Sequence, residues 1–129
     1  MKIIILDDSL TIRMTIEAYL EDLDVTEDEM FKFENGHDAL AFIKENGADM
    51  VFSDINMPLM NGYEFAGSVL SETPSLKKSF FAISGEENRE SYKKMKNIGV
   101  HQFIKKPIKV EHFRHFVLPE ILKIRARSI

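Results

Sequence analysis

Hydrophobic residues in this 129-residue chain gather in five short runs, separated by longer segments in which apolar and polar positions alternate with helical spacing. The runs lie at residues 2–6, 29–33, 49–53, 79–83 and 101–105. Parts of three runs, at 3–6, 50–52 and 80–83, are continuously apolar, which is typical of strands covered on both faces. The pattern therefore predicts a sheet whose strands are mostly buried.

The segments between the runs are predicted to be helices. They lie at residues 11–23, 37–45, 63–72 and 86–98, with a last helix from about residue 110. Pro119 falls inside the last segment and is expected to kink or split it, because proline removes a backbone donor and clashes with the preceding turn. Strands that alternate with helices predict an α/β fold, with a five-stranded parallel sheet and helices on both faces.

Polar residues whose side chains can react or bind a metal ion follow four of the five runs. Asp7 and Asp8 follow the first run, Asp54 the third, Ser84 the fourth and Lys106 the fifth. In parallel sheets of this kind, ligands bind beyond the carboxyl ends of the strands. We therefore expect these five side chains to converge at one edge of the sheet.

The mutual repulsion of three converging carboxylates has to be offset by positive charge or by protonation. Two carboxylates about 4 Å apart repel each other by about 4 kcal/mol at an effective dielectric constant near 20. They must either raise one another's pKa or bind a cation, and a small set of hard oxygen ligands favours Mg²⁺. Alone, Asp7 and Asp8 would be interpreted as a solvated turn before a helix. Because Asp54 follows another buried run and Lys106 follows the last run, the sequence favours a cation-binding site instead.

Asp54 is the candidate nucleophile of this site. A carboxylate can attack phosphorus to form an acyl phosphate if the developing charge is neutralised. Mg²⁺ and Lys106 would supply that neutralisation, and the hydroxyl group of Ser84 would supply a hydrogen bond. Singly, Ser84 is typical of a turn and Lys106 of a solvated surface, so the hypothesis depends on their joint placement.

The amino-acid composition excludes several further classes of protein. The chain has no cysteine, which excludes disulfides, thiolate catalysis and cysteine-based zinc sites. No apolar stretch approaches the roughly 18 residues of a membrane span, and the first apolar run ends in two aspartates, unlike a secretory signal. We expect one cytoplasmic domain over residues 1–129 that does not associate with membranes.

Charge is distributed unevenly along the chain. Residues 1–76 carry 16 acidic and 4 basic residues, whereas residues 77–129 carry 5 acidic and 13 basic residues. Two interpretations stay open: a basic face for an acidic partner, or neutralisation within one compact fold. Direct nucleic-acid binding is not expected, because no helix-turn-helix or RNA-binding motif accompanies the basic residues.

The arrangement of these motifs resembles the receiver domain of two-component response regulators. Asp-Asp follows the first strand, Asp-x-x-Met-Pro-x-Met-x-Gly begins at Asp54, Ser-Gly follows the fourth strand and Lys-Pro the fifth. The sequence Asp-Asp-Ser-x-Thr-x-Arg at residues 7–13 is similar to that of single-domain chemotaxis regulators. The resemblance implies a flavodoxin-like receiver fold with strand order 2-1-3-4-5.

The resemblance also implies roles for individual residues. Asp54 would accept a phosphoryl group from a histidine kinase or histidine phosphotransfer protein. Asp8, Asp54 and the backbone carbonyl of Asn56 would bind Mg²⁺ directly, with Asp7 acting through water. Lys106 would pair with the acceptor carboxylate and then with the phosphoryl group, and the Lys106–Pro107 bond would be cis.

The resemblance also implies residues that change conformation when the chain is phosphorylated. Ser84 and Phe103 occupy the two family switch positions, and Asn56 and Glu86 those that tune the lifetime of the phosphoryl group. The resemblance implies a phosphoacceptor that catalyses its own phosphorylation and dephosphorylation, not a turnover enzyme. Output would pass through the surface of the fourth and fifth helices and fifth strand to a protein target, with chemotaxis as a candidate pathway. The chain would be a monomer or an activation-dependent dimer.

Three other functions share parts of this pattern. A haloacid-dehalogenase-type phosphatase needs a second aspartate two residues after the nucleophile, where this chain has Asn56. A flavin-binding flavodoxin needs a hydroxyl-rich loop after the first strand, whereas Asp7 and Asp8 would repel a flavin phosphate. An interaction module that keeps the fold without being phosphorylated stays open as the alternative.

Overall fold

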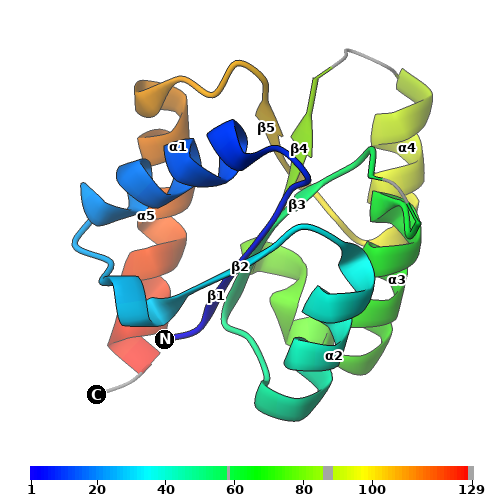
Figure 1. Cartoon of the computed structure of the whole chain (residues 1–129), viewed down its shortest axis with the longest axis horizontal. Helices are drawn as coiled ribbons and strands as arrows, with labels where there is room; N and C mark the ends of the chain where they lie inside the picture. Colours follow the sequence, from blue (N-terminus) through cyan, green and yellow to red (C-terminus); the bar gives the residue numbers. More distant parts are fainter. Residues whose placement is uncertain (58, 86–88, 128–129) are drawn as a thin grey trace.

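The computed structural model describes residues 1–57, 59–85 and 89–127, which form a parallel five-stranded sheet between two layers of helices (Figure 1). The strands are β1 Ile3–Leu6, β2 Met30–Phe33, β3 Met50–Asp54, β4 Phe80–Ser84 and β5 Gln102–Lys105. Their order is β2-β1-β3-β4-β5, and every neighbouring pair is parallel. This confirms the predicted fold class and strand order.

Five α-helices and two short 3₁₀ helices connect the strands. The α-helices are α1 Leu10–Glu21, α2 Gly36–Asn46, α3 Gly62–Glu72, α4 Arg89–Ile98 and α5 Val110–Arg127, and the 3₁₀ helices are η1 Glu27–Glu29 and η2 Pro74–Ser79. Helices α1 and α5 cover one face of the sheet, and α2, α3 and α4 cover the other. None of the helices in the described parts of the chain is long and apolar enough to cross a bilayer.

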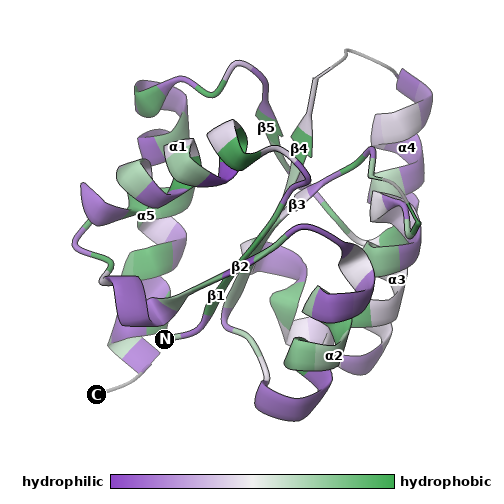
Figure 2. Ribbon diagram, viewed as in Figure 1, coloured by the Kyte–Doolittle hydropathy of each residue, from purple (hydrophilic) through white to green (hydrophobic). Residues whose placement is uncertain are grey.

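The sheet separates two hydrophobic cores. Alternate residues of β1 show the division: Ile3 and Ile5 pack with α1 and α5, whereas Ile4 and Leu6 pack on the opposite side. All four are fully buried, which explains why the run is continuously apolar. Figure 2 shows hydrophobic residues concentrated in the strands and hydrophilic residues over the outer surfaces of the helices.

Polar caps begin three helices at the carboxyl edge of the sheet. The Ser9 side chain accepts a hydrogen bond from Ile12 N, and Asn35 and Asn61 cap α2 and α3 in the same way. Each cap satisfies a backbone N–H that the first helical turn leaves free. The caps therefore fix where the chain turns from each strand into the next helix.

Pro119 is expected to kink or split the last helix, and the structure shows that it does not split it. Helix α5 continues through Pro119 from Val110 to Arg127. Proline at position 119 leaves the carbonyl of His115 without its helical donor. Both residues are exposed, so water can satisfy that carbonyl, and buried neighbours such as Val117 and Ile121 hold the helix on the sheet.

Candidate functional site

Three carboxylates lie together at the carboxyl edge of the sheet. Each of Asp7, Asp8 and Asp54 offers an oxygen, and these oxygens lie within 4.8 Å of one another. Asp7 is fully buried, Asp54 is 5% exposed, and Asp8 is exposed. They meet because β1 and β3 are parallel neighbours whose polar residues come at the ends of both strands.

Lys106 faces two of these carboxylates. Its Nζ atom lies 3.3 Å from Asp7 Oδ2 and 3.5 Å from Asp54 Oδ2. Its backbone N–H donates to the carbonyl of Ser84 at 2.7 Å, which joins the ends of β4 and β5. The Lys106–Pro107 bond that follows is cis, as the resemblance implies. One lysine thus links four strand ends.

Backbone donors hold the other carboxylate oxygens of the two buried aspartates. Ser9 N donates to Asp7 Oδ1 at 2.8 Å, and Asn56 N donates to Asp54 Oδ1 at 3.2 Å. Asp7 Oδ2 is buried and receives no well-aligned hydrogen bond within the described parts of the chain, although Lys106 lies nearby. The site therefore keeps an oxygen with unused acceptor capacity.

The electrostatics of the two buried carboxylates are unfavourable. Burial raises the pKa of Asp7 above its ordinary value, although the hydrogen bond from Ser9 and the charge of Lys106 partly oppose the rise. Burial, followed by the neighbouring Asp7 carboxylate, also raises the pKa of Asp54. Lys106 again opposes the rise. One lysine does not offset three carboxylates, so the site favours a further cation.

Gly62 brings the first turn of α3 against the loop after Asp54. Gly62 N donates to the carbonyl of Ile55 at 2.9 Å. A Cβ atom at residue 62 would lie 2.5 Å from the carbonyl oxygen of Asp54 and 2.6 Å from Ile55 Cα. Only glycine allows this approach, so α3 and the Asp54 loop are packed directly on each other.

The two residues that the resemblance implies for the switch lie on the neighbouring strands β4 and β5. Ser84 is buried at the end of β4, and Phe103 is half-buried on β5. The Phe103 ring packs edge-on against Tyr92 of α4, with ring centres 4.8 Å apart. Asn56 is exposed in the loop after β3, while Glu86 lies outside the described residues.

Arg13 is a residue near the site to which the sequence analysis gives no role. Its Nη1 atom donates to the backbone carbonyl of Asp7 at 2.6 Å, although Arg13 lies on α1. Its position in the motif at residues 7–13 was a signal, but a motif does not show which backbone group a side chain contacts. Arg13 thus ties α1 to the acidic turn.

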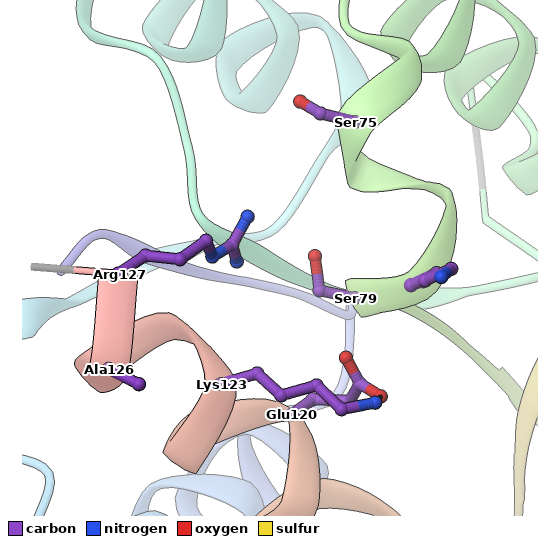
Figure 3. Close-up of a pocket in the computed structure, with 7 residues that line it drawn as sticks. Ser75, Ser79, Glu120, Lys123, Ala126 and Arg127 are labelled. Carbon is purple, nitrogen blue, oxygen red and sulfur yellow. Dashed lines mark hydrogen bonds and ion pairs between the residues drawn. The ribbon is translucent and has the colours of Figure 1, made fainter.

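A cavity at the far end of the sheet is remote from these carboxylates. It has a volume of about 400 Å³ and lies between η2 and the last turns of α5 (Figure 3). Its polar lining residues include Ser79, Lys78, Glu120, Lys123 and Arg127. Ser79 precedes β4, so the cavity is at the amino edge of the sheet, whereas the carboxylates are at the carboxyl edge. The candidate site is the cluster of charges at the carboxyl edge, not this cavity.

The donor set suits a hard divalent cation. Carboxylate oxygens are ligands that Mg²⁺ prefers, and Mg²⁺ retains waters where the protein supplies few ligands. Asp8 is exposed and can bind from the solvent side, while Asp7 Oδ2 has unused acceptor capacity. The residues present therefore fit such an ion.

Comparisons with known proteins agree with this geometry. The family model described as "Response regulator receiver domain" matches residues 3–118. Chemotaxis protein CheY-3 of Vibrio cholerae is 30% identical over 107 residues, which cover 83% of this chain and 81% of CheY-3. The transcriptional regulatory protein FlgR of Helicobacter pylori is 34% identical over 111 residues, which cover 86% of this chain but only 27% of FlgR.

A solved structure shows the same architecture. The chemotaxis protein CheY4 of Vibrio cholerae superposes with a TM-score of 0.74 at 27% sequence identity, covering 99% of this chain and 98% of CheY4. Five parallel strands in the order 2-1-3-4-5, flanked by helices, form a flavodoxin-like receiver fold. The chain belongs to the response regulator receiver domain family of two-component systems.

Proposed function

We propose that this chain is a phosphorylation-activated signalling switch in which Asp54 accepts a phosphoryl group. The observation that carries the proposal is the placement of Asp54, which is nearly buried among Asp7, Asp8 and Lys106. The donor would be the phosphohistidine of a histidine kinase or of a histidine phosphotransfer protein. Membership of the receiver family supports this class of donor.

Mg²⁺ is the cofactor in this proposal. The carboxylates of Asp8 and Asp54 and the backbone carbonyl of Asn56 would hold it directly, with Asp7 acting through water. When bound, the ion would supply positive charge against the oxygens of the phosphoryl group. The rest of the site consists of the protein's own groups.

Transfer would be a single displacement at phosphorus. An oxygen of Asp54 forms the new O–P bond, and the N–P bond of the phosphohistidine breaks, leaving its electron pair on the imidazole nitrogen. Lys106 lies 3.5 Å from Asp54 and can follow the new charge, while Ser84 would donate its hydroxyl hydrogen to a phosphoryl oxygen. Attack by water would later release inorganic phosphate and regenerate Asp54.

The chain would thereby catalyse its own phosphorylation and dephosphorylation without acting as a turnover enzyme. In this proposal, Asn56 and Glu86 flank the phosphoryl group and tune its lifetime. Asn56 is exposed two residues after Asp54, where it can affect the approach of water. The decay rate of the phosphorylated form in an Asn56 variant measures this role.

Output would pass through the surface formed by α4, β5 and α5. A phosphoryl group adds about −1.5 to −2 charges, which can bias Ser84 and Phe103 toward a second arrangement. This surface carries exposed basic residues, including Arg89, Lys93 and Lys96, which suit an acidic protein target. The similarity to proteins named for chemotaxis supports that pathway, and activation-dependent dimerisation is an alternative output.

Phosphorylation with acetyl phosphate tests the proposal. The protein is incubated with and without Mg²⁺, and intact mass is followed for the wild type, Asp54→Asn and Asp49→Asn. Asp49 is a matched control, because it is an exposed aspartate just before the opposite end of the same strand. We expect one Mg²⁺-dependent phosphoryl adduct in the wild type and in Asp49→Asn, and none in Asp54→Asn.

The other outcomes separate the alternatives. An adduct that persists in Asp54→Asn would assign the acceptor to another residue. No adduct in any folded variant, with or without Mg²⁺, would favour an interaction module that works without phosphorylation.

A further inference from the structure

Arg13 occupies an unusual place for a charged residue on a helix. It lies one turn into α1, and only 9% of its surface is exposed. Its guanidinium group points back to the end of β1, where Nη1 donates to the Asp7 carbonyl at 2.6 Å. Burying an arginine is costly unless its donors are used, so this short contact is a substantial part of its compensation.

The same guanidinium group reaches a second element. Its Nη2 atom lies 3.7 Å from Oε1 of Glu34, which follows β2. Glu34 is 77% exposed at its side chain, so this ion pair is weak. The hydrogen bond to the Asp7 carbonyl is therefore the stronger of the two contacts.

The contacts to Asp7 leave its backbone and side chain little freedom. Asp7 N donates to the carbonyl of Phe33 at 3.2 Å, and its Oδ1 atom accepts from Ser9 N. Arg13 holds the remaining group, the carbonyl, which belongs to the peptide that joins Asp7 to Asp8. Fixing that carbonyl fixes the peptide plane from which Asp8 projects.

Asp8 depends on this support more than its neighbours do. Within the described parts of the chain, no hydrogen bond or ion pair holds the Asp8 carboxylate, whereas Asp7 and Asp54 each have a backbone donor and Lys106. A metal ligand must be held close to its productive position, or binding has to order it. The backbone of Asp8 is thus the element that prearranges its carboxylate.

We propose that Arg13 is a positioning residue that prearranges Asp8 for Mg²⁺ through its hydrogen bond to the Asp7 carbonyl. This inference rests on the proposed function, since it assumes that the acidic cluster binds Mg²⁺. Residues that orient metal ligands affect metal affinity by about 10–100-fold when they are replaced. Arg13 acts one step further back, through the backbone, so we expect the lower end of that range.

The test compares Arg13→Met with Arg125→Met. Methionine keeps an apolar stem of similar length and removes the guanidinium donors. Arg125 is the matched control, because its Nη2 atom also donates to backbone carbonyls, those of Leu23 at 3.1 Å and Asp24 at 2.9 Å, away from the carboxylates. Both variants lose a guanidinium–carbonyl contact, but only Arg13→Met loses one at the acidic turn.

The readout is the Mg²⁺ dissociation constant of the unphosphorylated protein. Magnesium is titrated at constant ionic strength, and the amide resonances of Asp8 and Asn56 are followed by NMR. Urea unfolding of each metal-free variant is measured in parallel. We expect affinity to fall about tenfold in Arg13→Met and to stay within roughly twofold in Arg125→Met. Arg13→Lys keeps one donor and should recover most of the affinity.

Asp8→Asn separates failure of this inference from failure of the proposed site. If the wild type binds Mg²⁺, Asp8→Asn binds it much more weakly and Arg13→Met binds like the wild type, Arg13 has no positioning role. Equal losses of affinity in Arg13→Met and Arg125→Met would also overturn the inference, because they would reflect stability alone. A wild type that binds no Mg²⁺ would overturn the proposed site and this inference together.

Discussion

Lys106 is shared between the carboxylates of Asp7 and Asp54, which come from the ends of two neighbouring strands. Its Nζ atom lies at almost the same distance from Asp7 and Asp54, and both acids have raised pKa values through burial. Without a metal ion, one ammonium group has to offset three carboxylates. The fold therefore carries an electrostatic cost at the residues that give the site its chemistry.

That cost should appear as a pH dependence of stability. An acid with a higher pKa in the folded state than in the unfolded chain stabilises the fold at low pH, and this contribution is lost as pH rises through the folded-state pKa. Near neutral pH and without metal, we expect Asp54→Asn to be more stable than the wild type by on the order of 1 kcal/mol. The difference should shrink as pH falls toward the ordinary carboxyl pKa of about 4.

Urea unfolding in EDTA at a series of pH values measures this difference. Asp49→Asn serves as the control, because Asp49 lies outside the cluster and should give no such gain at neutral pH. Adding Mg²⁺ should stabilise the wild type more than Asp54→Asn. A difference between Asp54→Asn and wild type that is independent of pH would contradict the assignment.

At the scale of elements, the start of α3 is a tightly constrained junction beside the site. Asn61 caps the helix, and Gly62 N donates to the Ile55 carbonyl. The backbone of Gly62 lies so close to Asp54 and Ile55 that no side chain fits. The helix therefore supports the loop that follows Asp54.

Replacing the two glycines of α3 by alanine tests this support. In Gly62→Ala the new Cβ atom meets backbone, which cannot move aside as a side chain can, so we expect a loss of more than about 2 kcal/mol. Gly67→Ala adds a Cβ that meets nothing within 4 Å, and it should stabilise the protein by about 0.5–1 kcal/mol. Thermal or urea unfolding of the two variants checks both signs. Equal effects of the two substitutions would exclude a special role for Gly62.

The sequence predicts elements better than it predicts contacts between them. The apolar runs and the polar residues after them predict the strand ends, because both features are local in the chain. The continuity of α5 depends on the exposure of Pro119 and His115, which becomes known only when the helix is placed on the sheet. The contact of Arg13 with the Asp7 carbonyl is likewise tertiary, and no periodicity reports it.

At the scale of the whole molecule, the sheet must be covered on both faces to be stable. Phe52 and Phe81 stack within the sheet, with ring centres 5.1 Å apart, and Phe113 of α5 stacks on Phe52 at 5.5 Å. Tyr19 of α1 packs against the same Phe113 ring. Phe113 thus joins the sheet to both helices that cover this face.

Two phenylalanines on α5 allow a matched test of this packing. Phe113 is 1% exposed, whereas Phe116, one turn later, is 44% exposed. We expect Phe113→Ala to lower the free energy of unfolding by about 3–5 kcal/mol, and Phe116→Ala to change it by less than about 1 kcal/mol. Chemical denaturation measures both values, and similar losses would show that α5 is held differently.

The separation of the cores from the carboxyl edge also has a consequence for how the sequence can diverge. Asn56 and Leu59 are exposed in the loop after β3, so replacing them leaves both cores intact. Gly62 and Asp7 lie at the same edge but are enclosed by backbone or buried, and few replacements fit there. Substitutions can therefore accumulate at the exposed positions of this loop without loss of the fold, while the enclosed positions at the same edge tolerate few.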